Sequence, residues 1–302
     1  QAQVVTDASM HVVEQRAFDF DGDFSAVWWD FGDLPKNGEI TIRSVSIGTA
    51  NAQGELLGDL TELDDVPFAT EWRDAGGPSK DAYSYDLARN TLYVFFSAHD
   101  EKMIIQVDYT IANAAQAYAD VADLYWKYVG ADWAETSENV TMNVWLPVPE
   151  GQSVTPGENV KAWGHGPIDG TVNIHDDGSI TYHASKVESG QFAEAHVLFP
   201  VEWLTDLSPE ALAAHEGVMH TQEVLDQERM WADQANRDRI FSLLFVLATA
   251  LICVLLIVWA LRAYFKYGKE HTPDFTEEYW RDVPAPGIHP AVIGRLWRWD
   301  RS

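Results

Sequence analysis

The chain has 302 residues, of which 46% are hydrophobic, and it carries a formal net charge of −27 and a single cysteine. This length allows one large domain or two small ones with sizeable cores, and one cysteine excludes an internal disulfide. Because so negative a chain repels phosphate backbones, its composition argues against a nucleic-acid-binding protein.

The first two hundred residues are dominated by short segments rich in Val, Ile, Thr and aromatic residues, divided by Gly, Asp, Asn and Pro. This pattern is typical of a β-sandwich and not of alternating strands and helices. The predicted strands are residues 11–20, 39–48, 91–98, 102–111, 139–147, 178–184 and 193–200. We expect a mainly β domain, built as one sandwich or as two packed immunoglobulin-like halves.

An acidic stretch, DFDGDFSAVWWD at residues 19–30, has the spacing of a calcium-binding loop. Asp19, Asp21, Asp23 and Asp30 occupy loop positions 1, 3, 5 and 12. The glycine stands at position 4 and not 6, and strands flank the segment, so an acidic hairpin turn is the competing interpretation.

Trp28 and Trp29 end the same stretch, and adjacent strand residues face opposite sides of a sheet. We expect one of the two to pack in the core. The other, Trp28, is a candidate contact residue for a binding partner.

The segment AAQAYADVADLYWKY, residues 114–128, interrupts the strand pattern. Its large side chains recur at helical spacing; they are Tyr118, Val121, Leu124, Tyr125 and Tyr128. We therefore expect a helical connection at residues 114–138, between a first β subdomain at 1–113 and a second at 139–207.

The stretch KAWGHGPIDG, residues 161–170, combines aromatic, basic and turn-forming residues. In an extended chain Trp163 and His165 share one face, while Gly164 and Gly166 share the other. The glycines and the following proline indicate a tight bend with close backbone approach. Since His165 has no Cys, Ser or second His at motif spacing, we favour a structural role, with a binding site as the alternative.

Other motifs with known chemistry are missing from the sequence. The histidines form no HxH or HExxH pattern, and there is no P-loop, dinucleotide fingerprint or GxSxG elbow. Carboxylates are so abundant that apparent catalytic pairs carry no weight. We expect no cofactor, except for the calcium ion that the acidic stretch could hold.

Helical signals begin after residue 207. Ser208-Pro209-Glu210 has the form of a helix start, and we expect a helical stalk at residues 208–239 with a break near Gly217. Residues 240–261 then contain no charge, Pro or Gly over 22 positions. At about 1.5 Å per residue this run crosses a hydrocarbon core of roughly 30 Å, which predicts a single transmembrane helix.

The basic residues around this run predict its orientation. Arg262, Lys266 and Lys269 follow it, whereas Arg237 and Arg239 precede it among acidic residues. This distribution favours a plasma-membrane protein whose C-terminus is cytoplasmic. The start at a Gln in place of Met fits a removed signal peptide or a cut chain. Residues 1–239 hold 13 Lys and Arg against 41 Asp and Glu, so we expect an acidic extracytoplasmic domain.

The tail at residues 262–302 is rich in proline and aromatic residues and is too short to bury a core of its own. We expect it to dock on the inner leaflet, on a second copy of the chain or on another protein. For protein docking the predicted edge consists of Ile288, Pro290, Val292, Ile293 and Leu296.

Four blocks resemble the DUF2207 family of uncharacterised bacterial membrane proteins: residues 10–31, residues 109–147, residues 161–172 with 191–200, and residues 279–294. The resemblance implies a signal peptide, an extracytoplasmic β-rich domain and a membrane helix, with no catalytic residues. Family members usually continue with further membrane segments, so the chain looks truncated. The resemblance also makes a LemA-type membrane protein a candidate partner.

Together these features predict a non-catalytic binding or assembly protein of the envelope. The alternative is an envelope enzyme, such as a glycan hydrolase that uses ectodomain carboxylates. A deep cleft lined by two carboxylates in opposed environments would favour the enzyme, and a flat exposed aromatic patch would favour the binding protein.

Overall fold

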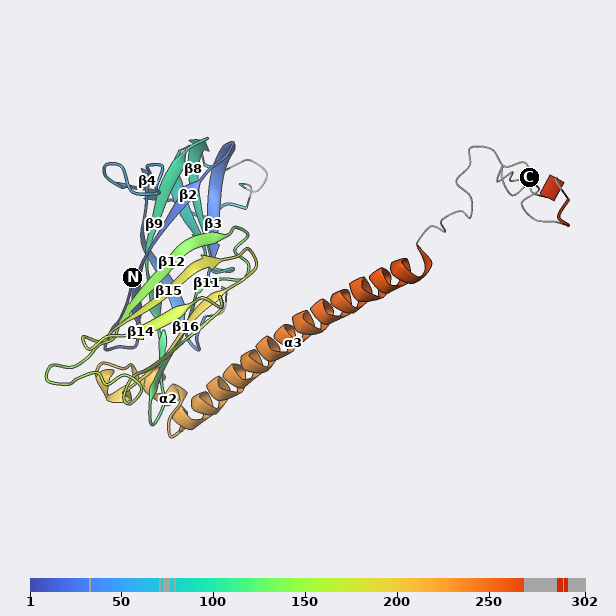
Figure 1. Cartoon of the computed structure of the whole chain (residues 1–302). Helices are drawn as coiled ribbons and strands as arrows, with labels where there is room; N and C mark the ends of the chain where they lie inside the picture. Colours follow the sequence, from blue (N-terminus) through green and yellow to red (C-terminus); the bar gives the residue numbers. More distant parts are fainter. Residues whose placement is uncertain are drawn as a thin grey trace. The chain divides into compact units, whose positions relative to one another are not determined.

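The computed structural model describes residues 1–32, 34–70, 72, 77–78, 80–268, 287–289 and 291–292. The prediction of a mainly β fold followed by one long apolar helix is confirmed (Figure 1). Residues Gln1–Arg229 form one compact unit, and Met230–Ser302 form a second.

The described elements are mainly short strands up to residue 199 and helices after it. The strands are β1 (Ala2–Val4), β2 (Met10–Asp19), β3 (Asp23–Asp30), β4 (Glu39–Thr49), β5 (Thr61–Glu62), β6 (Asp64–Asp65), β7 (Ala82–Asp86), β8 (Thr91–His99), β9 (Lys102–Ala112), β10 (Ala115–Ala117), β11 (Ala122–Val129), β12 (Ser137–Trp145), β13 (Lys161–His165), β14 (Thr171–Ile174), β15 (Ser179–Val187) and β16 (Ala193–Phe199). The helices are the 3₁₀ turn η1 (Val201–Trp203), α2 (Pro209–Ala214) and α3 (Thr221–Tyr267).

The described strands form one long sheet and two smaller ones. The long sheet has the order β14-β15-β12-β1-β2-β9-β4-β5, and the smaller sheets have the orders β10-β11-β16-β13 and β3-β8-β7-β6. Strand β1 joins the parts of the long sheet, because it pairs with β12 on one side and with β2 on the other. The predicted β subdomains at 1–113 and 139–207 therefore share a sheet.

They also share a core. One contiguous cluster of buried side chains draws on all three sheets, and its largest fully buried members include Met10, Tyr109, Phe199 and Trp203. Each such side chain contributes roughly 1.5–3 kcal/mol through burial. Unit Gln1–Arg229 is thus stabilised as a whole and not as two independent halves.

The predicted helical connection at 114–138 is wrong, because this segment contains strands β10 and β11 and no helix. In β11 the buried residues Ala122, Leu124 and Trp126 alternate with polar or exposed residues between them. This period of two places the apolar side chains on one face of a sheet. Strands β10 and β16 on either side supply cross-strand hydrogen bonds, which override the helical spacing of the aromatic residues.

After β16 the chain turns into helices. The Ser208 hydroxyl accepts a hydrogen bond from the Ala211 amide (3.1 Å) and caps α2. Gly217, with φ of +71°, lies between α2 and α3. Helix α3 then continues from Thr221 to Tyr267 without interruption.

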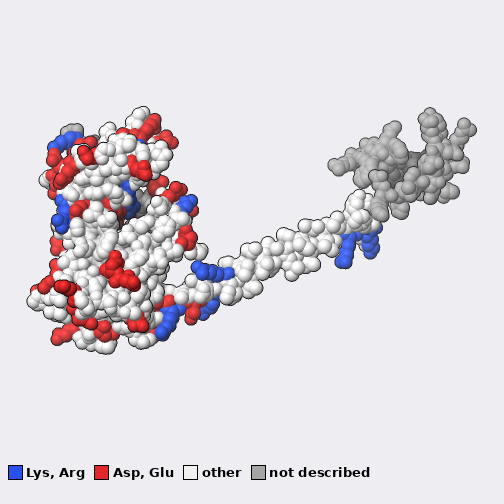
Figure 2. Space-filling model, turned by 60° about the vertical axis from the view of Figure 1, so that its left-hand side comes forward, with Lys and Arg blue, Asp and Glu red and all other residues white. Residues whose placement is uncertain are grey.

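The charge-free stretch of α3 is exposed in the structure. No other part of the described chain covers its side chains, such as Phe245 (73% exposed) and Trp259 (69% exposed). In Figure 2 this stretch is a run of white residues with blue ones at either end. Its Thr249 hydroxyl donates to the Phe245 carbonyl (2.9 Å), so this polar group is satisfied within the helix.

Only part of the predicted docking edge of the tail is described. Ile288 and Val292 are exposed, at 43% and 50%. Pro290, Ile293 and Leu296 lie outside the described residues, so docking of the tail stays a prediction.

Candidate functional site

One face of the β10-β11-β16-β13 sheet carries a connected group of titratable side chains. Strand register places these side chains in two rows across three strands. One row consists of Tyr125, His196 and Trp163, and the other of Lys127, Glu194 and His165. Polar groups on a sheet face need a cover that satisfies them if they are to be buried.

The start of α3 supplies that cover. Asp120, in the turn between β10 and β11, accepts hydrogen bonds from the backbone amides of His220 (2.8 Å) and Thr221 (3.1 Å). These bonds satisfy amide donors at the helix N-terminus, where a negative charge is also favoured by the helix dipole. One turn later, Val224 (2% exposed) packs on Leu198 of β16. The first turns of α3 are therefore fixed to the sheet at both polar and apolar contacts.

Glu228 lies one turn beyond Val224 and joins two strands. Its Oε2 atom accepts from Nε2 of His165 on β13 at 3.0 Å, and its Oε1 atom accepts from Nδ1 of His196 on β16 at 2.7 Å. Glu228 is only 7% exposed. A carboxylate this buried requires such charge-assisted partners.

His196 is bonded by carboxylates at both ring nitrogens, because its Nε2 atom lies 3.0 Å from Oδ1 of Asp123. An ionised carboxylate only accepts hydrogen bonds, so both nitrogens donate and the ring is an imidazolium. Burial alone would lower the pKa of His196, but the hydrogen bonds to Asp123 and Glu228 outweigh burial and raise this pKa to about 9. Burial would raise the pKa of Glu228, and its hydrogen bonds to the two histidines lower it instead.

The chain of contacts extends to the residue before α3. The second oxygen of Asp123, Oδ2, lies 3.1 Å from Nε2 of His220. Tyr118 stacks on the His220 ring with centroids 3.8 Å apart, which holds that ring in place. We call His165, Glu228, His196, Asp123 and His220 the junction cluster, because these five residues link β13, β16 and β11 to the start of α3.

A second carboxylate, Glu194 of β16, borders the junction cluster. It accepts a hydrogen bond from the Tyr125 hydroxyl, and Nζ of Lys127 lies 3.4 Å away. Burial and the hydrogen bond to Glu194 raise the pKa of Tyr125. Nδ1 of His165 lies 3.8 Å from Glu194, so the electrostatics of this carboxylate and of the junction cluster are coupled.

This geometry is suited to holding a helix in place. The carboxylates of the junction cluster bind histidines of the same cluster, and the described residues contain no group of three or more His, Cys, Asp or Glu arranged for a metal ion. Buried ion pairs add little net stability, but removal of one partner is strongly destabilising. The junction cluster therefore specifies where α3 attaches.

The glycines of KAWGHGPIDG explain how His165 reaches this position. Gly166 has a φ of +129°, and a Cβ atom there would lie 2.2 Å from the Phe192 carbonyl oxygen. Only glycine permits this conformation and this approach. Trp163, on the same face as His165, is half-buried and packs beside Val224 and Leu198. Sequence reasoning missed Glu228, Asp123 and His196, because they are 32 to 73 residues apart from their partners and share no motif.

The calcium-loop interpretation of residues 19–30 is wrong, because the acidic residues cannot converge on one ion. Asp23 and Asp30 stand at opposite ends of β3, roughly 23 Å apart at about 3.3 Å per strand residue. Asp19 ends β2 and pairs with Lys102 at 2.7 Å, while Asp21 lies in the turn between the strands. The extended conformation of VWWD, favoured by its β-branched and aromatic residues, opens the loop.

The two tryptophans of the same stretch lie on opposite faces of β3. Trp29 is 4% exposed and belongs to the core, whereas Trp28 is 60% exposed. Trp28 belongs to the β3-β8-β7-β6 sheet, whereas the strand residues of the junction cluster belong to the β10-β11-β16-β13 sheet.

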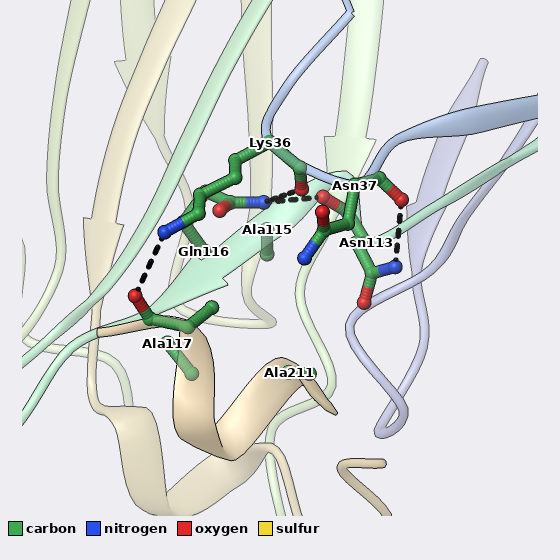
Figure 3. A pocket seen from close by; sticks show the side chains of 8 residues that line it. Lys36, Asn37, Asn113, Ala115, Gln116, Ala117 and Ala211 are labelled. Carbon is green, nitrogen blue, oxygen red and sulfur yellow. Dashed lines mark hydrogen bonds between the residues drawn. The ribbon is translucent and has the colours of Figure 1, made fainter. Parts of the chain in front are cut away.

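A small polar pocket lies between α2 and the loop before β4 (Figure 3). The Gln116 amide donates to the carbonyls of Lys36 and Asn113, and the Lys36 ammonium donates to the Ala214 carbonyl at 3.0 Å. Even with open solvent included, its empty volume is only about 190 Å³, so the pocket is too small to enclose a ligand. No carboxylate lines this pocket.

Comparison with known families places the β-rich part of the chain. A family model described as the N-terminal domain of a predicted membrane protein, DUF2207, matches residues 1–199. The match ends at the last residue of β16 and includes Asp123, His165 and His196 of the junction cluster. A search of the curated proteins found no match.

Proposed function

The chain belongs to the DUF2207 family of predicted membrane proteins, and we propose that it is a membrane-anchored binding or assembly protein of the bacterial envelope. In this proposal α3 crosses the plasma membrane once, with residues 1–239 on the extracytoplasmic side and the C-terminus in the cytoplasm. The β-rich unit holds a partner and catalyses no reaction.

The junction cluster is the observation that carries this proposal. The helix with the charge-free 22 residues starts inside the β-rich unit, where Glu228 and His196 are buried and His165 is partly buried. An enzyme that needs only to stay near a membrane can be held by any flexible tether. Here the start of α3 is fixed by buried ion pairs and by Asp120, which caps the helix from the turn before β11. Binding of a partner to the β-rich unit is therefore coupled to the membrane helix.

The surface of the β-rich unit supports a partner with basic groups. Residues 1–239 hold 41 Asp and Glu against 13 Lys and Arg, and red residues outnumber blue ones on the face in Figure 2. Such a field attracts cationic proteins and speeds their association.

The alternative, a glycan hydrolase, needs a carboxylic acid whose pKa is raised so that it can protonate the leaving group. Glu228, a buried glutamate, has a lowered pKa because it accepts from His165 and His196. The pocket in Figure 3 contains no carboxylate. These observations weigh against catalysis at the junction cluster and at this pocket.

The proposal is tested by cross-linking the full chain in intact cells, followed by detergent extraction, affinity purification and identification of the cross-linked species. We expect one envelope or membrane protein at a fixed ratio to the chain. A LemA-type protein is the candidate that the family resemblance suggests, and cross-links between two copies would indicate self-association. Release of sugars from envelope glycan by the purified chain, with no cross-linked protein, would establish the enzyme instead.

A further inference from the structure

Strand β3 lies at an edge of its sheet. In the order β3-β8-β7-β6 it pairs with β8 on one side, and none of the described strands pairs with its other side. An edge strand presents backbone N–H and C=O groups to the solvent and can accept a further strand. Protected edges usually carry Lys or Pro, and β3, with the sequence DFSAVWWD, has neither.

An irregularity in β3 brings its polar and aromatic side chains to the same face. The register shifts between Phe24 and Ala26, so that Asp23, Ala26, Trp28 and Asp30 stand opposite alternate residues of β8. Those residues are His99, Phe95, Tyr93 and Thr91. One face of the edge therefore has an exposed Trp28 between two exposed aspartates.

Aromatic side chains support Trp28 from the neighbouring strand. Tyr93, its register partner, stacks on Phe68 with centroids 5.4 Å apart and on Phe95 with centroids 6.3 Å apart. The row continues the apolar surface from Trp28 across β8. An exposed aromatic residue that extends a packed row is a suitable anchor for a partner side chain.

The charges on β3 select the occupant of this edge. A second copy of β3 added antiparallel would place Asp23 opposite Asp30 at both ends, and a parallel copy would place each aspartate near its equivalent. Like charges directly opposite one another destabilise strand pairing. A segment with Lys or Arg at both ends would instead form ion pairs, although His99 already lies 2.7 Å from Asp23.

We propose that β3 binds an extended peptide segment of a partner protein, apolar in its middle and basic at both ends, as an added strand with one side chain on Trp28. This inference rests on the proposed function and names the surface and the kind of partner. Strand addition supplies affinity through main-chain hydrogen bonds, and the side chains on alternate positions supply specificity.

The probe is a nine-residue peptide with Lys at both ends, Val at the third, fifth and seventh positions and Thr at the even positions. Its Lys and Val side chains share one face. We expect calorimetry with the full chain in nanodiscs to show one peptide per chain. Binding should be at least about tenfold weaker for a peptide with Glu at both ends, and for one with N-methyl groups on alternate amides.

Variants of β3 locate the binding. Trp28→Ala should weaken it about tenfold, and Trp145→Ala, which removes a tryptophan that is 37% exposed on β12, should leave it unchanged. The double variant Asp23→Lys, Asp30→Lys should bind the Glu-ended peptide better than the Lys-ended one. Asp59→Lys with Asp176→Lys changes the net charge equally at exposed sites elsewhere and should preserve the original preference.

Failure to bind any peptide at millimolar concentration, or binding that ignores both Trp28→Ala and the charge reversal, would overturn the inference. Chitohexaose serves as a comparison, and its binding through Trp28 without peptide binding would assign the edge to glycan. If cross-linking in cells still captures a partner with the Trp28→Ala variant, this inference is wrong while the proposed function stands. If the wild-type chain captures no partner in cells, the proposed function itself is wrong.

Discussion

Glu228 of α3 accepts a hydrogen bond from His196 of β16 at 2.7 Å, and both side chains are more than nine-tenths buried. This contact joins the last strand of the matched family region to the helix that holds the apolar run. Because a buried charge without its partner is costly, the two residues depend on each other. The attachment of α3 can therefore be changed by single substitutions and by pH.

Glu228→Gln should loosen the start of α3. An amide has only one acceptor oxygen and cannot accept from both His165 and His196 as the carboxylate does, and the loss should be about 1–3 kcal/mol. Hydrogen exchange of the full chain in nanodiscs should show amides 224–229 exchanging roughly tenfold or more faster. Glu223→Gln is the matched control, because Glu223 contacts His220 at 3.2 Å with a side chain that is 71% exposed. Equal protection in both variants would contradict the role of the junction cluster.

Raising the pH should weaken the same attachment. The pKa of His196 rises from 6.5 to about 9, so its stabilisation is complete below pH 6.5 and is lost as the pH increases through about 9. The lowered pKa of Glu228 gives stability that is present above its ordinary value of 4.5 and is lost on acidification. The rise in the His196 pKa from 6.5 to about 9 corresponds to roughly 3 kcal/mol in the free energy of unfolding. The shifts of His196 and Glu228 describe one ion pair, so their energies are not added.

Urea unfolding of the full chain in mild detergent between pH 6 and pH 9.5 measures this effect. The unfolding midpoint should fall across that range, and His196→Gln should flatten the dependence because no imidazolium remains at that position. A midpoint that is independent of pH in the wild-type chain would mean that His196 is not protonated in the folded state.

Removal of the His165 side chain should have a smaller effect than the change at Glu228. His165→Ala leaves Glu228 bonded to His196, so we expect a loss on the order of 1 kcal/mol in the same urea experiment. Trp163→Ala should cost less than the roughly 3–5 kcal/mol of a fully buried tryptophan, because Trp163 is half-buried. Normal stability in His165→Ala, with loss of a bound ligand, would make this segment a binding site.

The fold class could be predicted because its signals are local. Short β-branched segments and a 22-residue run without charge each report their own structure. The local pattern of residues 114–128 is ambiguous, because the aromatic residues recur at helical spacing while Ala122, Leu124 and Trp126 recur at strand spacing. The choice between them depends on the pairing of β11 with β10 and β16, and β16 is distant from β11 in the sequence.

Only one member of the junction cluster, His165, could be named as a candidate from the sequence. Asp123 falls in the segment interpreted as a helix, and His196 lies in a strand whose residues are all buried. Glu228 belongs to a polar helical stretch where a glutamate is typical of a solvated face. The pairing of β11 with β16 and the docking of α3 on these strands bring the three together, and no spacing along the chain indicates either contact.

Gly166→Ala should be among the most damaging of the glycine substitutions in the β-rich unit. It combines a φ of +129° with a Cβ position 2.2 Å from the Phe192 carbonyl oxygen. Gly190→Ala separates the two effects, because its φ is +76° and no atom lies within 4 Å of the added Cβ. We expect about 1–2 kcal/mol at Gly190 from conformation alone, and about 1–3 kcal/mol more at Gly166 from the clash. Equal losses in urea unfolding would show that β13 shifts to relieve the contact.

The proposed sidedness can be tested with single cysteines, because Cys253 is the only native one. In a Cys253→Ala background, Ile168→Cys places a thiol in the turn between β13 and β14, where the native side chain is 84% exposed. Tyr267→Cys places one at the last residue of α3, where the native side chain is 75% exposed. Since the helix between them is long enough to cross a bilayer, a membrane-impermeant maleimide should label Ile168→Cys in intact cells. It should label Tyr267→Cys only after permeabilisation. The reverse pattern would invert the orientation, and labelling of both positions in sealed cells would mean that α3 does not span the membrane.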